Sequence, residues 1–285
     1  MNLIRIIKKM RLVILISLLV SGCNPVILYP QGEIGFKITN LIRISFFMML
    51  CIVIPVIFMT IFFSYKYSKK SEKIQYKPEW SHSNKIESLI WFFPIVIITI
   101  LSILSWNTTH QLDQKKIIHS HNKAIKINVI SLDWRWLFIY PEEKIATINE
   151  IVIPVNTPVN FKITSNTVMN SFFIPALGSQ IYSMPGMQTN LNLIANHCGN
   201  FKGISSNYSG EGFSNMKFSV LVTNNRNSFN KWVMNVKSYP YKLQENKSFI
   251  KLLKPNKKYE VIYFSTVNTN FFNLVIKKFS MHQIH

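Results

Sequence analysis

Residues 125–130 read Ile-Lys-Ile-Asn-Val-Ile and open the part of the chain that determines its fold. Apolar and polar side chains alternate for most of this hexapeptide, which is the period of a strand with one buried face. Short apolar or alternating segments recur through the next hundred residues, at 148–153, 159–164, 190–195 and 216–222. The pattern predicts a β-domain over residues 124–224.

Turn-forming residues separate these segments, as in Asn156-Thr157-Pro158, Pro185-Gly186 and Gly210-Glu211-Gly212. Asn, Pro and Gly favour the backbone conformations that tight turns require. Many short strands with frequent turns favour an antiparallel sandwich or barrel. About 100 residues can bury an adequate core, so the segment can form a domain of its own.

Residues 225–285 follow a helical rather than a strand period. A first apolar stripe with helical spacing consists of Phe229, Trp232, Val233 and Val236. A second consists of Phe271, Phe272, Val275, Ile276 and Phe279. We expect a C-terminal helical arm that packs either on the sandwich or on a neighbouring subunit, and the pattern does not favour one over the other.

The amino terminus has the features of a secretory signal peptide over residues 1–22. Basic residues in the first eleven positions precede a short run at 12–20 that is apolar except for Ser17. A helix of this length reaches only about 14 Å, which is too short to cross a bilayer. Leu-Val-Ser-Gly-Cys at 19–23 resembles a bacterial lipobox, so we expect acylation of Cys23 and a lipidated external segment at 23–43. The alternative is a plain signal peptide with an incidental cysteine.

Two uncharged apolar runs follow, at residues 44–63 and 89–106. Each is long enough to span the hydrocarbon core, so we predict transmembrane helices at 44–64 and 89–106. The loop at 65–88 is rich in lysine, and the positive-inside rule places it in the cytoplasm. The chain is therefore expected to be multi-pass, with a linker at 107–123 and the β-domain outside.

The net charge of +20 raises the possibility of nucleic-acid binding. The basic residues are scattered and no recognition motif accompanies them, so we predict no nucleic-acid partner. A compositional bias of the genome is a simpler explanation, with attraction to anionic lipid headgroups as a secondary consequence. The three cysteines lie in different parts of the chain, and we expect no disulfide.

Several short motifs resemble subunit 2 of bacterial cytochrome bo-type ubiquinol oxidases. They are Trp134-Arg135-Trp136, Val-Met-Asn-Ser-Phe at 168–172, Gly-Ser-Gln-Ile-Tyr at 178–182 and Pro-Gly-Met-Gln-Thr at 185–189. The order of signal peptide, lipobox, two spans and β-domain is similar too. The resemblance implies a membrane-anchored α+β chain: a two-helix transmembrane hairpin, an external cupredoxin-like β-sandwich and the arm.

The same resemblance implies a setting for the chain. The haems, the copper and the ubiquinol site of such an oxidase reside in subunit 1, and this chain would hold no cofactor. Its partners would be subunit 1, the other oxidase subunits and the lipid bilayer. Its location would be the bacterial inner membrane, with the C-terminal domain on the periplasmic side.

Residues 199–216 resemble the copper loop of haem–copper oxidase subunit 2, but without its ligands. Copper-bearing members have Cys-x-Glu-x-Cys-x-x-x-His-x-x-Met in this loop and another histidine in a His-Ser-Phe context. The corresponding positions here are Asn170, Ser205, Asn207, Ser209, Phe213 and Met216. A soft metal needs thiolate and imidazole ligands. We therefore expect no metal site and no catalytic residue in this chain.

Two other features have a functional and a structural interpretation. In haem–copper oxidases a glutamate at the position of Glu87 lies at the mouth of a proton channel, where a carboxylate can collect protons. Alternatively, Glu87 forms a capping box with Asn84. Trp134 and Trp136 match an aromatic patch that receives electrons in cytochrome c oxidases. Without copper, we favour core packing or contact with subunit 1.

These observations predict accessory subunit 2 of a proton-pumping oxidase that oxidises ubiquinol and reduces oxygen to water. A cytochrome c oxidase subunit 2 is an alternative, although the residues at the ligand positions argue against it. A membrane lipoprotein with a cupredoxin-like domain and a role outside respiration is a third interpretation.

Overall fold

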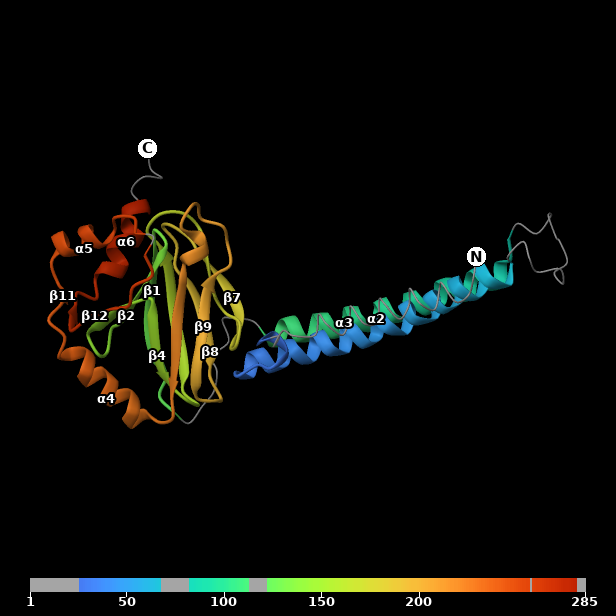
Figure 1. The fold of residues 1–285 in the computed structure, drawn as a ribbon, viewed down its shortest axis with the longest axis horizontal. Coiled ribbons are helices and arrows are strands. Elements are labelled where there is room, and N and C mark those ends of the chain that lie inside the picture. Colours follow the sequence, from blue (N-terminus) through green and yellow to red (C-terminus); the bar gives the residue numbers. More distant parts are fainter. Residues whose placement is uncertain (1–25, 68–81, 113–121, 257, 281–285) are drawn as a thin grey trace, which may run out of the picture.

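The computed structural model describes residues 26–67, 82–112, 122–256 and 258–280. The expected signal peptide and Cys23 lie outside the described residues. A hairpin of two long helices projects from one side of a compact domain, termed the external domain after the location expected from the sequence (Figure 1). Each helix is long and apolar enough to cross a membrane.

The hairpin consists of α2 (Glu33–Lys66) and α3 (Asn84–Gln111), which lie side by side (Figure 1). Both helices extend beyond the uncharged apolar runs at 44–63 and 89–106 at each end. Hydroxyl groups within the apolar runs bond to their own helix: Thr60 donates to the Val56 carbonyl at 2.7 Å and Thr99 to the Ile95 carbonyl at 2.8 Å. These bonds satisfy polar groups that lipid cannot.

The external domain is the predicted sandwich, built from two mixed sheets. One has the strand order β12-β3-β2-β1-β5-β8 and the other β4-β10-β9-β6-β7. The strands of the first are β12 (Ile262–Phe264), β3 (Ile145–Ile148), β2 (Arg135–Tyr140), β1 (Ile125–Leu132), β5 (Pro158–Ser165) and β8 (Thr189–Ile194). Those of the second are β4 (Glu150–Pro154), β10 (Lys217–Thr223), β9 (Gly199–Ser205), β6 (Asn170–Ile174) and β7 (Gly178–Ser183). The pairs β1–β5 and β4–β10 are parallel, so the sheets are not purely antiparallel as expected.

The strand predicted at 148–153 corresponds to β4 only from residue 150, because Ile148 ends β3. The structure divides it at Asn149, whose φ of 58° is in the left-handed region. The chain leaves one sheet at the end of β3 and enters the other at the start of β4. Asparagine tolerates this conformation better than most residues, which explains how two adjacent apolar segments can belong to different sheets.

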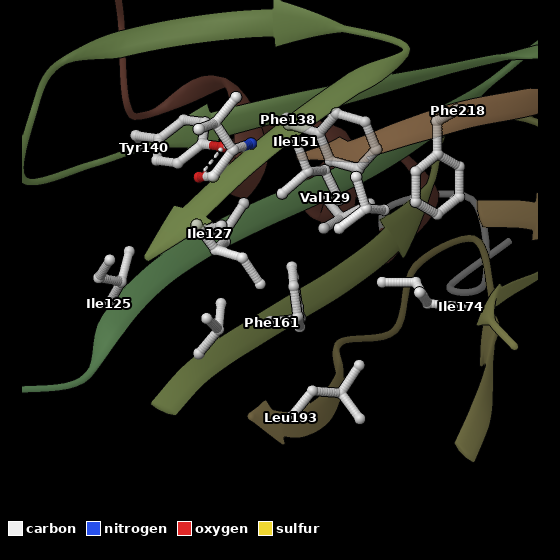
Figure 2. Packing of buried hydrophobic residues seen from close by; sticks show 14 of the residues in the cluster. Ile125, Ile127, Val129, Phe138, Tyr140, Ile151, Phe161, Ile174, Leu193 and Phe218 are labelled. Carbon is white, nitrogen blue, oxygen red and sulfur yellow. Dashed lines mark hydrogen bonds between the residues drawn. The ribbon is translucent and has the colours of Figure 1, made fainter. Parts of the chain in front are cut away.

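The principal core lies between the two sheets and is strongly aromatic. Phe172 of β6 and Phe218 of β10 stack with ring centroids 5.0 Å apart, and Trp136 meets Phe172 at 5.4 Å. Figure 2 shows this cluster, in which Phe138 and Tyr140 also point inward. The Tyr140 hydroxyl donates to the Val152 carbonyl at 3.0 Å and accepts from the Val152 amide at 2.9 Å. A buried phenol is thereby satisfied on a strand of the opposite sheet.

A second core lies between the outer face of the six-stranded sheet and the C-terminal arm. Leu137, Ile139 and Ile148 pack there with Phe249, Phe271 and other apolar residues of the arm. Strand β2 is therefore buried on both faces. A strand covered on both sides shows no alternation, and this is why the sequence pattern did not reveal β2.

The arm contains α4 (Arg226–Lys237), α5 (Asn246–Leu252) and α6 (Phe271–Ser280), so the two predicted amphipathic helices are confirmed. Their apolar stripes pack on the sandwich. The arm is not wholly helical, however, because β12 pairs with β3 and β11 (Lys242–Leu243) pairs with β13 (Thr266–Val267). The arm thus completes the six-stranded sheet and belongs to the fold of the external domain.

The start of α2 is joined to the sandwich through its backbone. The Gln31 amide donates to the Ala176 carbonyl at 2.7 Å and the Gly35 amide to the Leu177 carbonyl at 3.1 Å. Gly178, with φ 94°, lies so close that a Cβ there would be 2.7 Å from the Gly35 nitrogen. This close approach fixes the external domain against the membrane hairpin.

Candidate functional site

Two of the positions that correspond to copper ligands, Asn170 and Ser205, meet in a buried polar cluster of the sandwich. Asn170, at the start of β6, is buried, and its amide nitrogen donates to the Val168 carbonyl at 3.2 Å. The Ser205 hydroxyl donates to Asn170 Oδ1 at 3.2 Å. The structure therefore joins the two halves of the loop-and-strand site by a direct side-chain bond.

Ser131 and Ser183 extend this network beyond the predicted positions. Asn170 Nδ2 lies 3.4 Å from Ser131 Oγ, and the Ser131 and Ser183 hydroxyls are 3.0 Å apart. The Ser183 hydroxyl donates to the Thr164 carbonyl at 2.7 Å. All of these side chains are buried. The network satisfies polar groups whose burial would otherwise be unfavourable.

The remaining loop positions are held by separate contacts. The Asn207 amide donates to the Met169 carbonyl at 3.0 Å, and the Ser209 hydroxyl lies 3.8 Å from the Met216 sulfur. Met216 is buried in the aromatic core. Phe213, in the short 3-10 helix η2 (Phe213–Asn215), packs edge-on against exposed Tyr208 at 5.6 Å.

Trp134 covers the loop from the β1–β2 turn. Its φ of 60° is unusual for a large side chain, and its indole nitrogen donates to the Ser209 carbonyl at 2.9 Å. A Cβ on Gly212 would be only 2.3 Å from the indole ring. The ring therefore packs directly on the Gly212 backbone. This contact was not predicted from the sequence, although the pair of glycines at 210 and 212 is a possible signal of it.

Trp136 lies elsewhere, fully buried between the sheets. Phe138 and Tyr140 are also buried in the core. The two tryptophans that match the aromatic patch are thus separated, because Trp134 covers the loop and Trp136 lies in the core with Phe138 and Tyr140.

The donors of this cluster do not fit a soft metal ion. They are amide and hydroxyl groups, with a single thioether from Met216, whereas soft metals require thiolate or imidazole. Among the described residues, no three or more His, Cys, Asp or Glu side chains gather in one place. The hydroxyl and amide groups are engaged with one another. The cluster therefore provides hydrogen bonds within the domain.

Glu87 lies in the first turn of α3 and is exposed. The N-cap residue is Ser83, and its side chain makes no capping bond. The side chain of Asn84 instead contacts the ring of His82. The alternative prediction of a capping box between Asn84 and Glu87 is therefore wrong. The carboxylate keeps only the general benefit of a negative charge near a helix N-terminus.

Comparison with known proteins identifies the family. Residues 140–223 match the model for the periplasmic domain of cytochrome c oxidase subunit II. The cytochrome bo(3) ubiquinol oxidase subunit 2 of Buchnera aphidicola subsp. Baizongia pistaciae is 57% identical over 257 residues, 90% of each chain. The chain belongs to the cytochrome bo-type ubiquinol oxidase subunit 2 family. The family member from Pseudomonas putida is 49% identical, over 92% of this chain and 83% of that protein.

As a ubiquinol oxidase subunit 2, the chain is a component of an oxidoreductase complex of the respiratory chain, which confirms the central expectation from its sequence. The two apolar helices and the cupredoxin-like sandwich fit a membrane-anchored subunit. Residues 237–283 match the COX aromatic rich motif, which corresponds to most of the arm. Among solved structures, the periplasmic domain of subunit II of cytochrome oxidase from Bradyrhizobium japonicum is 23% identical. It aligns with 42% of this chain and 96% of that domain at a TM-score of 0.39.

Proposed function

We propose that this ubiquinol oxidase subunit 2 is an accessory subunit without a copper centre of its own, supporting a subunit 1 that holds the haems, the copper and the ubiquinol site. The observation behind the proposal is the bond between Asn170 and Ser205. Copper-bearing relatives have a histidine and a cysteine at these two positions. In this chain an asparagine and a serine occupy these positions, and their side chains form a hydrogen bond.

A domain that keeps the loop but has no electron acceptor is suited to a complex whose electron donor is membrane-bound ubiquinol. The external domain then needs no docking site for a soluble cytochrome. Its task is to cover and stabilise subunit 1. The copper-loop segment is still ordered by Trp134, Asn170 and Ser205, which is consistent with a structural role for that surface.

Electron paramagnetic resonance of the purified oxidase tests the absence of copper in this chain. We expect no mixed-valence binuclear copper signal, together with complete dependence of quinol-driven oxygen uptake on the presence of this subunit. A mixed-valence signal that disappears when Ser205 and Ser209 are changed to alanine would refute the proposal. Normal quinol oxidation in cells that lack the subunit would refute the accessory role.

The proposed topology places the hairpin in the inner membrane and the sandwich in the periplasm, with Cys23 acylated at the external end. Support comes from the lysine-rich loop at 65–88, the lipobox-like sequence and the two apolar helices. Mass spectrometry of the amino-terminal peptide tests the acylation. An unmodified Cys23 in the mature chain, or an intact signal peptide, would contradict it.

We propose in addition that Glu87 takes up protons from the cytoplasm. Its support is the exposed carboxylate at the start of α3, which is not used as a capping group. Replacing Glu87 by Gln removes the titrating group while preserving size, so we expect turnover to fall about tenfold or more, with less proton pumping. Lys85→Gln, a change at another exposed residue of the same turn, is the matched control. Unchanged turnover and pumping in an assembled Glu87→Gln oxidase would refute the role.

A further inference from the structure

The chain just before α2 folds back along that helix. The 3-10 turn η1 (Val26–Leu28) is held by two side chains of α2. The Thr39 hydroxyl lies 2.5 Å from the Ile27 carbonyl and 2.9 Å from the Gly35 carbonyl of its own helix, and the Arg43 guanidinium donates to the Leu28 carbonyl at 2.9 Å. Thr39 is buried at this contact. These bonds hold η1 against α2 at residues 39 and 43, which lie further along the helix than the contact of Gly35 with the sandwich.

The position of η1 along the helix is set by these two partners. Arg43 is the last charged residue before the uncharged run that begins at residue 44. Thr39 lies five residues before that run, which is about 7 Å along an α-helix. The interfacial layer between the hydrocarbon core and water is about 5 to 7 Å thick on each side. In the proposed topology, the turn η1 therefore lies at the depth of the lipid headgroups.

The side chains that η1 presents outward are apolar or aromatic. Val26 is 50% exposed, Ile27 47% and Tyr29 64%. Exposed apolar side chains at the headgroup level lower the free energy of the chain when they insert among the lipids, and tyrosine favours this layer in particular. Helix α2 also exposes apolar side chains just beyond Arg43, where Phe47 is 65% exposed.

Arg43 suits the same environment. Its guanidinium reaches back toward the N-terminal end of α2 to the Leu28 carbonyl. Long basic side chains near a membrane boundary extend in this way to keep their charge in the polar layer. One carbonyl leaves further guanidinium donors that can face lipid phosphates. The residue therefore links the turn, the helix and the headgroup layer.

We propose that η1 and Tyr29 form an interfacial anchor that inserts into the outer headgroup layer of the bilayer. The proposal rests on the proposed membrane topology and does not depend on acylation of Cys23. The ligand is the lipid interface, not a protein partner. The two bonds that hold η1 beside α2 next to the uncharged run, and the combination of aliphatic, aromatic and arginine side chains, favour this choice.

Spin-label accessibility in the complete oxidase tests the proposal. Cys51 and Cys198 are changed to serine, Ile27 to cysteine, and the labelled complex is placed in lipid nanodiscs. Collision rates with oxygen, which concentrates in lipid, and with a water-soluble nickel chelate then report the depth of the label. We expect the label at position 27 to lie in the interfacial layer, about 5 to 7 Å thick. Protein without the Ile27→Cys change corrects for any labelling of Cys23.

Met234→Cys provides the water reference, because Met234 is 63% exposed on α4 of the external domain. A label at position 27 that collides with the nickel chelate as often as the one at 234 overturns the proposal. A label that is immobile and shielded from both reagents also overturns it, because a protein subunit would then cover η1. Either result on a correctly inserted hairpin leaves the proposed topology and the copper-free assignment intact.

Thr39 should act as a positioning residue for the anchor. Thr39→Val removes the hydroxyl that bonds to the Ile27 carbonyl and keeps a similar shape. We expect greater mobility of the label at position 27 and more frequent collisions with the nickel chelate. Thr39→Ser keeps the hydroxyl and should restore the original depth. Identical depth and mobility in the Val and Ser variants would overturn this part of the inference.

Discussion

At the scale of single residues, Asn149 connects three parts of the external domain. Its side-chain oxygen accepts from the Trp136 amide at 2.9 Å, and its side-chain nitrogen donates to the Glu260 carbonyl at 3.1 Å. Its backbone turns the chain from one sheet to the other at positive φ. One asparagine thus joins β2, β4 and the arm.

Replacing Asn149 by Ala should lower the free energy of unfolding by about 2 to 4 kcal/mol. The change leaves the buried Trp136 amide unpaired and replaces asparagine, which tolerates the left-handed region, by alanine, which tolerates it less well. Asn149→Gly loses the same bonds but relieves the backbone, so its loss should be smaller. Urea unfolding of the detergent-solubilised chain, followed by tryptophan fluorescence, measures both. Equal losses in the two variants would show that the backbone conformation contributes little.

We expect the stability of the external domain to decrease at alkaline pH because of Tyr263. Its hydroxyl donates to Glu150 Oε1 at 2.6 Å, and burial together with this carboxylate raises the pKa of the Tyr263 phenol above its usual value. Because the folded-state pKa is raised, the stabilisation is fully present below the unfolded value of about 10 and is lost as the pH rises through the folded-state pKa.

Tyr263→Phe should therefore destabilise the chain at neutral pH, and the difference from wild type should shrink above about pH 10. Burial also raises the pKa of the Tyr140 phenol, so some alkaline destabilisation should remain in the variant. Unfolding free energies across pH 7 to about 11 provide the measurement. Tyr182→Phe, at an exposed position on β7, is the control. A constant difference at all pH values would contradict the assigned titration.

Some residues of the candidate site could be predicted from the sequence, and others could not. The position of Ser205 could be assigned from the spacing of the loop, and that of Asn170 from the Ser-Phe pair that follows it, because neither pattern depends on the chemistry of the ligands. The role of Ser131 and Ser183 could not, because they come from other strands and meet the cluster only through the folding of both sheets. The contact of Trp134 with Gly212 is likewise non-local.

At the scale of elements, predictions succeeded where one face of a helix or strand is buried. The helix periods of α4 and α6 were readable because each packs on one side only. Strand β2 was not, because the sandwich and the arm bury both of its faces. Strand β12 is three residues long and exists through its pairing with β3, which no local pattern indicates.

The contact between α2 and β7 can be tested directly. Gly178→Ala should cost about 1 to 2 kcal/mol from its positive φ alone, and its Cβ would also displace the Gly35 backbone. We expect faster hydrogen exchange of the Gly35 amide, which bonds to the Leu177 carbonyl. Asn40→Ala, at an exposed position of α2, should leave that exchange unchanged. Unaltered protection in Gly178→Ala would show that the contact does not fix the helix.

At the scale of the whole molecule, the charge is distributed unevenly. Residues 124–224 contain six basic and five acidic side chains, whereas residues 225–285 contain eleven basic and two acidic ones. The sandwich is thus nearly neutral, and most of the net charge of +20 lies in the arm and in the amino-terminal and hairpin segments. A uniform compositional bias does not by itself explain this division. In the proposed topology, the lysines beside the spans orient the hairpin.

That orientation can be tested with cysteines at known places in the chain. Cys198 is exposed in the external domain, between β8 and β9, and Cys51 lies within the apolar run of α2. A membrane-impermeant maleimide applied to intact spheroplasts should label Cys198 and not Cys51, because the reagent reaches only thiols in water outside the membrane. A cysteine introduced by Ser83→Cys, just before α3, should react only after the membrane is permeabilised. Labelling of position 83 in intact spheroplasts, with protection of Cys198, would reverse the topology and would place Glu87 on the wrong side to collect cytoplasmic protons.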